Sequence, residues 1–172
     1  FFEAIEAIGG EIDQDEYRSK VSSQYKQYDK PQYSVVDDRS AVEAYMQTRG
    51  ISKQTLDYAG VKQDDKGNIV FAYRNLLGDV EMVKYRPARK VAKGENKMWA
   101  APNGRPLLYG MHQVDTTKPV LVCEGEIDRL AAIEAGYSNA VSVPNGASGL
   151  TWIEENWPWL EQIEQFVLWF NN

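Results

Sequence analysis

The residues best suited to chemistry form one short acidic segment. Glu124, Glu126 and Asp128 directly follow an apolar run at 120–123, with Gly125 between the first two acids. The run predicts a strand buried on both faces, as in a parallel sheet, and ligands of open α/β sheets collect at the carboxyl ends of such strands. Glu124 at the strand tip and Asp128 in a first helical turn can therefore point at one spot. Their oxygens are hard ligands of the kind that Mg²⁺ or Mn²⁺ prefers.

The same acids also have a purely structural explanation. Carboxylates near a helix start complement the helix dipole, which is worth roughly 0.3–1 kcal/mol each. The spacing alone favours this explanation over a catalytic one, and the direction of Glu126 is the least certain of the three. The single Cys123 excludes an internal disulfide and a cysteine-based zinc module, and we expect it to be a buried apolar residue. His112 is expected at a surface or packing position.

A second feature is a basic stretch that stands out in a chain of net charge −6. Its members are Lys84, Arg86, Arg89, Lys90, Lys93 and Lys97, and only Glu95 opposes them. Tyr85 and Trp99 flank the stretch, so phosphates and stacked bases are plausible ligands. A solvated loop balanced by nearby acids is the alternative. Lys84 and Arg86 alternate along a predicted strand and therefore share one face.

The elements that must position these residues fall into two patterns. The last third alternates strand, helix, strand, helix, strand, with strands at 120–123, 140–143 and 166–170 and helices at 128–134 and 151–165. This rhythm predicts a parallel α/β sheet. The preceding part predicts two short helices within 38–60, capped by Asp38 or Ser40 and by Ser52, and a hairpin or meander with strands at 69–73 and 80–85. The fold class is therefore α/β, with a mixed α+β part ahead of a parallel part. The predicted units are a helix and linker arm at 1–33, an α+β subdomain with the basic hairpin at 34–116, and the α/β subdomain at 117–172.

The composition limits the remaining classes of protein. Hydrophobic residues make up 43% of the chain and charged residues 26%, as in ordinary globular proteins. No apolar run has the 18 or so residues of a membrane span. These features and the lone cysteine fit a cytoplasmic protein.

Three motifs in this order resemble the Toprim domain of bacterial and bacteriophage primases, most of all the phage-type primase-helicases. They are "LVCEGEID", "VSVPNGA" and "FVLWFNN". Residues 50–112, with "GISKQTLDYAGV" and "PLLYG", also resemble the subdomain that precedes it in primases. The resemblance implies the catalytic core of a DNA primase, which synthesises short RNA primers on single-stranded DNA by two-metal nucleotidyl transfer. Mg²⁺ or Mn²⁺ would be the cofactor and nucleoside triphosphates the substrates.

The resemblance also assigns residues. Glu124 and Asp128 would be the catalytic acids and metal ligands, and Asn171 stands where the family has the first aspartate of an Asp-x-Asp pair. Because Asn is neutral and the second aspartate is absent, we expect weak metal binding and little polymerase activity from these residues alone. Asn145 and Gly146 would lie beside the metal, with backbone amides toward phosphate. The nucleic-acid or nucleotide ligands would be Lys84, Arg86, Lys90, Lys93, Lys97 and Trp99.

The implied partners are a single-stranded DNA template, ribonucleoside triphosphates and a replicative helicase, fused or separate. A zinc-binding module upstream in a longer protein is expected, and no membrane; the compartment would be the cytoplasm of a bacterium or a phage-infected bacterium. Two alternatives stay open. One is another Toprim protein, such as a nuclease or topoisomerase, and the other is a non-catalytic nucleic-acid-binding prophage remnant, which Asn171 favours.

Overall fold

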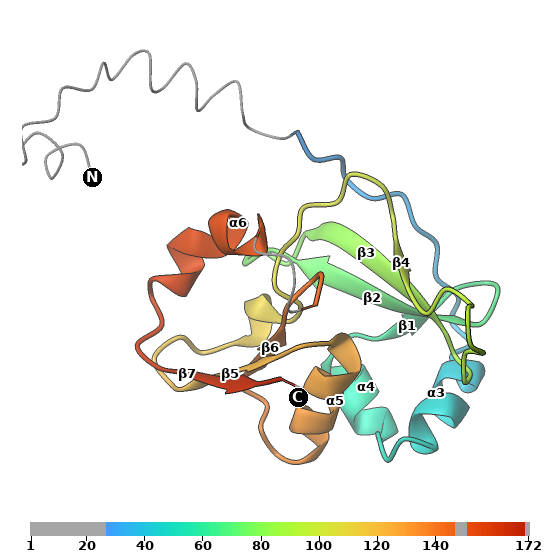
Figure 1. Cartoon of the computed structure of the whole chain (residues 1–172). Coiled ribbons are helices and arrows are strands. Elements are labelled where there is room, and N and C mark those ends of the chain that lie inside the picture. The colour runs from blue at the N-terminus through green and yellow to red at the C-terminus, as the bar shows by residue number, and fades with distance from the viewer. Residues whose placement is uncertain (1–26, 147–150, 171–172) are drawn as a thin grey trace, which may run out of the picture.

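The computed structural model describes residues 27–146 and 151–170, and its first sheet is antiparallel. The strand order is β1-β2-β3-β4 (Figure 1). The strands are β1 (Lys62–Gln63), β2 (Asn68–Arg74), β3 (Val80–Pro87) and β4 (Trp99–Ala100). The predicted hairpin is confirmed as β2 and β3. Sequence patterns missed β1 and β4, because two residues are too few to show an alternation.

Two short helices cover one face of this sheet. They are α3 (Ser40–Gln47) and α4 (Lys53–Tyr58), and their apolar side chains pack against Ile69, Phe71 and Tyr73 of β2. The predicted cap of α4 is confirmed, because the Ser52 hydroxyl accepts a hydrogen bond from the Thr55 amide at 3.3 Å. At α3 the N-cap is Arg39, which makes no side-chain cap, and Asp38 accepts from the Ser40 amide at 2.9 Å.

The second sheet is parallel, with strand order β6-β5-β7. Its strands are β5 (Val120–Cys123), β6 (Ala140–Ser142) and β7 (Phe166–Trp169), connected by α5 (Glu126–Glu134) and α6 (Thr151–Leu160). The predicted parallel α/β unit is thereby confirmed. Two boundaries were wrong: α5 begins at Glu126 rather than Asp128, since acids suit a first turn, and α6 ends at Leu160 rather than residue 165.

Two of the hydrophobic clusters show how the loop before β5 joins the two parts of the molecule. One contains residues of α3, α4 and the antiparallel sheet together with Tyr109 and Leu130. The other contains Leu107, Leu108 and Met111 together with β5, β6 and the end of α6. The loop before β5, with the short 3₁₀ helix η1 (Met111–Gln113), therefore packs into both parts of the molecule. This packing holds α5 and the tip of β5 against the β2–β3 hairpin.

The central strand of the parallel sheet and the outer strand β7 differ in burial. Cys123 at the end of the central strand β5 is fully buried, as expected. By contrast, residues 166–170 in and after β7 are 36–67% exposed, and Phe166, Leu168 and Phe170 line an apolar pocket of about 650 Å³ against α6. Residues 1–26 of the predicted helix and linker arm, and Asn171, lie outside the described residues. Among the described residues, no helix has the length and apolar character needed to cross a membrane.

Candidate metal and nucleotide site

Glu124 and Asp128 stand at the carboxyl end of β5, where the sequence placed them. Gly125 is the N-cap of α5, and Asp128 lies in the first turn of that helix. The turn after β6 approaches from the other side: a Cβ atom on Gly146 would lie 4.0 Å from Glu124 Oε1. The structure thus brings Glu124, Asp128 and Gly146 together at one edge of the sheet.

The electrostatics of this pair indicate a site that favours added positive charge. Burial raises the pKa of Asp128 above its ordinary value, the amide of Gly125 opposes the shift, and the negative charge of Glu124 adds to it. Glu124 is half-buried, and within the described residues it has no hydrogen bond or ion pair. A cation between the two carboxylates would relieve their repulsion.

Glu126 has a different role, although it belongs to the same acidic segment. Its side chain is only 3% exposed, and its Oε1 accepts hydrogen bonds from the Tyr73 hydroxyl and from Lys84 Nζ, the latter at 2.6 Å. Lys84 Nζ also donates to the carbonyl of Pro144 at 2.7 Å. Burial raises the pKa of Tyr73 well above its ordinary value, and Glu126 raises it further. This network ties the hairpin to the start of α5 and to the turn that carries Asn145.

Two arginines of the antiparallel part lie near Tyr45. Burial raises the pKa of Tyr45, but the guanidiniums of Arg86 in β3 and of Arg49, just after α3, lower it overall. The positive charge of Arg49 partly offsets the rise in the pKa of Asp128, so Arg49 is close enough to act on the site electrostatically. Arg86 Nε is buried and has no hydrogen-bond partner among the described residues. Sequence reasoning missed Arg49, since nothing local links it to Asp128.

The predicted basic stretch is divided between the two faces of the hairpin. Lys84 pairs in register with Ala100, and Tyr85 pairs with Trp99, so lysine and aromatic residues point to opposite faces. Lys90, Lys93 and Lys97 are exposed in the loop between β3 and β4. The sequence predicted a shared face for Lys84 and Arg86 only; in the structure Lys84 faces the acidic segment, and Tyr85 and Trp99 lie on the other face of the hairpin.

The donor set fits part of a metal site. In the ranges 27–146 and 151–170, no group of three or more histidine, cysteine, aspartate or glutamate side chains could hold a metal ion. Glu124 and Asp128 offer two carboxylates, and Mg²⁺ is commonly held by one or two carboxylates plus substrate phosphates and water. The pair is therefore compatible with a substrate-assisted magnesium site.

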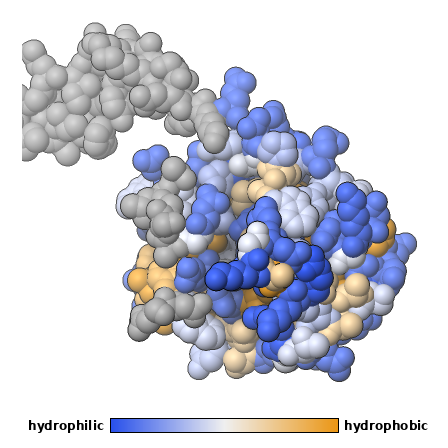
Figure 2. Space-filling view, turned by 45° about the vertical axis from the view of Figure 1, so that its right-hand side comes forward, coloured by the Kyte–Doolittle hydropathy of each residue, from blue (hydrophilic) through white to orange (hydrophobic). Residues whose placement is uncertain are grey.

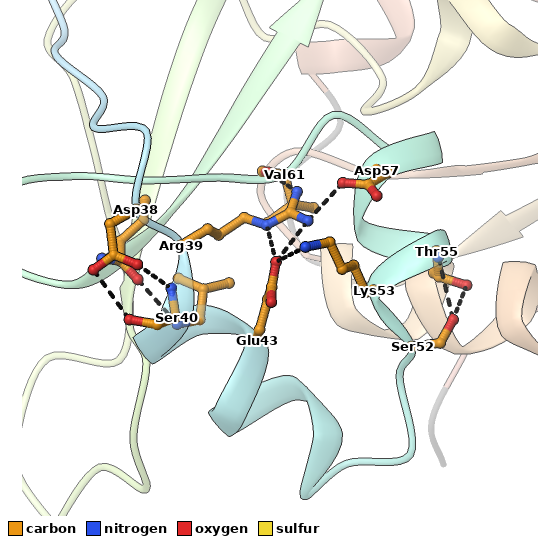
Figure 3. Close-up of polar contacts among 11 residues, drawn as sticks. Asp38, Arg39, Ser40, Glu43, Ser52, Lys53, Thr55, Asp57 and Val61 are labelled. Carbon is orange, nitrogen blue, oxygen red and sulfur yellow. Dashed lines mark hydrogen bonds and ion pairs between the residues drawn. The ribbon is translucent and has the colours of Figure 1, made fainter.

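A second acidic cluster lies between α3 and α4, beside a polar pocket of about 440 Å³ (Figure 3). Glu43 and Asp57 in this cluster are paired with Arg39, at 3.0 Å and 2.6 Å. Arg39 also donates a hydrogen bond to the carbonyl of Val61. The hydrogen bond from Arg39 lowers the pKa of Asp57 below its ordinary value, against a small effect of burial. These contacts join two helices and leave no carboxylate pair to hold a cation.

Sequence comparison finds primases and primase-helicases, although no protein-family profile matches the chain. The Twinkle homolog protein, chloroplastic/mitochondrial, of Arabidopsis thaliana is 38% identical over 109 residues, which is 62% of this chain and 14% of that protein. The DNA helicase/primase of Enterobacteria phage T3 is 31% identical over 129 residues, which is 72% of this chain and 22% of that protein. The chain thus spans less than a third of the curated relatives it matches.

Solved structures give the class of fold. The primase fragment of the bacteriophage T7 primase-helicase matches with a TM-score of 0.61 and 28% identity, over 90% of this chain and 66% of that one. T7 primase domains bound to an RNA/DNA hybrid and dTTP match with a TM-score of 0.61 and 30% identity, over 73% of this chain and 57% of that one. The chain therefore has the fold of a primase catalytic core. In sequence it is similar to a phage DNA helicase/primase and to plant proteins described as a Twinkle homolog and a primase homolog.

Proposed function

We propose that this chain carries the catalytic core of a DNA primase, an enzyme that synthesises short RNA primers on a single-stranded DNA template. The observation that supports it best is the pair Glu124 and Asp128, which is free of ion pairs within the described residues and sits at the carboxyl end of β5 in a primase-core fold. The Toprim assignment of residues 117–172 is part of the same proposal.

The reaction is nucleotidyl transfer. The 3′-hydroxyl oxygen of the primer attacks the α-phosphorus of a ribonucleoside triphosphate, a new P–O bond forms, the hydroxyl proton is lost and pyrophosphate leaves. Mg²⁺ or Mn²⁺, when bound, lowers the pKa of the hydroxyl and neutralises charge on the triphosphate. Glu124 and Asp128 would hold the metal, with Asn171 as a third and weaker ligand, and Glu124 would also be the general base that takes the hydroxyl proton.

The phosphate ligands follow from the contacts. Arg86 has a buried Nε without a hydrogen-bond partner among the described residues, and the charge of Arg49 acts on Asp128, so we assign both arginines to the triphosphate. The amides of Asn145 and Gly146 face the same spot in this proposal. Lys84 would have to release Glu126 or Pro144 to bind phosphate, so we assign it chiefly to positioning.

The wider assignments complete the proposal. Lys90, Lys93, Lys97 and Trp99 contact the template strand. The core works within a longer protein, with a zinc-binding module that selects the template and a fused or separate helicase, in the cytoplasm of a bacterium or a phage-infected bacterium. The T7 primase-helicase fragment and the phage T3 helicase/primase are relatives that support this arrangement.

Primer synthesis tests the proposal. The longer protein is given single-stranded DNA, labelled ribonucleotides and Mg²⁺, and Glu124→Gln is compared with Asp57→Asn, an exposed acid of the α3–α4 cluster. Replacing a residue that only orients a metal ligand typically costs about 10–100-fold, so loss of a direct ligand should reduce product by more than about 100-fold. Asp57→Asn should keep full activity. Product that is unchanged in Glu124→Gln, or absent in the wild type, contradicts the proposal.

A further inference from the structure

Arg129 of α5 carries a positive charge in the interior of the protein. The face in Figure 2 is mainly hydrophilic, with apolar colour confined to small patches, so charge belongs to the surface there. Arg129 is instead 0% exposed, and none of the ion pairs among the described residues includes it. A buried charge is costly, and an apolar side chain of similar volume is often at least as stable in its place. The presence of Arg129 therefore calls for an explanation other than stability.

The guanidinium of Arg129 connects α5 to two other segments. Its Nε donates to the carbonyl of Ala140, the first residue of β6, at 2.7 Å, and its Nη2 donates to Gln113 Oε1 in η1 at 2.9 Å. Gln113 Nε2 in turn donates to the carbonyl of Tyr58, the last residue of α4, at 2.6 Å. Nη1 is buried and has no hydrogen-bond partner among the described residues. The arginine therefore holds α5 against the parallel sheet and against the antiparallel part at the same time.

The chain leaves room for this guanidinium at Gly110. The φ of this residue is +87°, and a Cβ atom there would lie 2.2 Å from Arg129 Cζ, so any side chain would displace the arginine. The Arg129 Cζ atom lies 5.0 Å from the ring centre of Tyr109, a cation–π contact that is strongest away from water. The Tyr109 hydroxyl donates to the carbonyl of Ala59 at 3.1 Å, and its ring packs against Tyr73 of β2. The guanidinium thus occupies a place shaped for it between the two parts of the molecule.

Arg129 also belongs to the local structure of the carboxylate site. Its amide donates to the carbonyl of Gly125 at 3.1 Å, and this bond closes the first turn of α5, which carries Asp128. The strand that its Nε contacts, β6, leads into the turn where Gly146 approaches Glu124. A side chain that joins α5 to β6 therefore fixes the two elements on which Asp128 and Gly146 are carried.

We propose that Arg129 is a positioning residue for the cation site: it holds the first turn of α5, and with it Asp128, at a fixed angle to β5 and β6. Its guanidinium has no contact with the cation itself. A planar fork of donors can fix this angle, whereas the single ammonium of lysine or an apolar side chain cannot. Ligand sites need such support, because their side chains must be held within about 0.5 Å of the productive geometry. The inference rests on the proposed function and deepens it by naming a residue that orients a metal ligand.

The test compares two anchors of the same helix. Arg129→Met replaces the guanidinium by an unbranched apolar side chain, and Gly110→Ala displaces it by filling its place. Glu134→Ala is the matched control, because Glu134 at the far end of α5 accepts hydrogen bonds from Ser52 and Thr55. Mn²⁺ binding to the folded proteins is followed by electron paramagnetic resonance. Affinity should fall at least about tenfold in Arg129→Met and in Gly110→Ala, and stay within about threefold of wild type in Glu134→Ala.

Amide hydrogen exchange, measured by NMR without metal, gives a second readout. In Arg129→Met the amide of residue 129, which bonds to Gly125, should lose at least about tenfold of its protection. The amide of Ala135, which bonds to the carbonyl of Ala131 at the far end of α5, should change by less than about threefold. A general loss of stability would instead expose both amides alike.

The outcomes separate this inference from the proposed function. Mn²⁺ affinity within about threefold of wild type in a folded Arg129→Met, or an equal loss in Glu134→Ala, overturns the positioning role and leaves the cation site in place. Equal loss of protection at both ends of α5 also overturns it. Wild type that binds no Mn²⁺ rejects the cation site, and the positioning role falls with it.

Discussion

The two acidic clusters of this molecule look alike in composition and differ in their electrostatics. Between α3 and α4, Arg39 pairs with Glu43 and Asp57, and the pKa of Asp57 is lowered (Figure 3). At the end of β5, the pKa of Asp128 is raised, first by burial, and Glu124 has no partner among the described residues. Carboxylates that join two elements are neutralised by a basic side chain, whereas carboxylates of a ligand site have no such partner. The Glu124–Asp128 pair therefore stands out as the place for a cation.

The largest effect is expected at Glu126, the acid that lies between the two proposed ligands but behaves like a structural one. Glu126→Gln leaves Lys84 buried without its counter-charge, and removing one partner of a buried pair costs about 3–5 kcal/mol. Urea unfolding followed by circular dichroism measures the loss. Replacing Lys84 as well, by Met, should recover part of it. A loss below about 1 kcal/mol would show that the pair is dispensable.

A smaller loss is expected at the α3–α4 cluster. The Arg39 side chain is 11% exposed and serves two carboxylates and one carbonyl, so Arg39→Ala should cost about 1–3 kcal/mol in the same assay. Arg89→Ala is the matched control, since that arginine is 59% exposed and its pair with Glu95 is solvated. The control should not shift the unfolding midpoint measurably. Equal effects in the two variants would contradict the structural role of Arg39.

The smallest effects are opposite pH dependences of stability. A raised carboxyl pKa means that the folded state holds its proton longer than the unfolded state, so the Asp128 contribution weakens as pH rises through that window. Asp128→Asn should therefore be more stable than wild type at pH 7 and lose this advantage near pH 3. Asp57 has a lowered pKa, so Asp57→Asn should be less stable than wild type at pH 7, and this deficit should vanish as pH falls through the folded-state pKa.

Thermal melting of the three proteins from pH 3 to pH 8 checks the signs. If both variants shift in the same direction at pH 7, the electrostatic distinction between the clusters fails. Adding Mg²⁺ should raise the melting temperature of the wild type more than that of Asp128→Asn.

Much of the fold follows from local pattern, but the site does so only in part. Alternating and continuous apolar residues located β2, β3 and β5. The cap at Ser52 could be predicted because its partner, Thr55, lies only three residues away. The sequence could not show that Glu124 is unpaired while Glu126 is held in an ion pair, because the partner, Lys84, lies in another sheet. For the same reason the sequence did not indicate Arg49, whose charge acts on Asp128 across a long sequence separation. Trp99 and Lys84 could be assigned to opposite faces only once the β3–β4 register was known.

Binding of Mn²⁺, followed by electron paramagnetic resonance, shows whether Glu124 and Asp128 form a cation site. Free Mn²⁺ gives a signal that falls on binding, so wild type, Glu124→Gln, Asp128→Asn and Asp57→Asn can be titrated side by side. The account predicts weak but saturable binding to wild type and to Asp57→Asn, and affinity at least about tenfold lower in the other two. Binding that survives both Glu124→Gln and Asp128→Asn, or that is lost in Asp57→Asn, would contradict it.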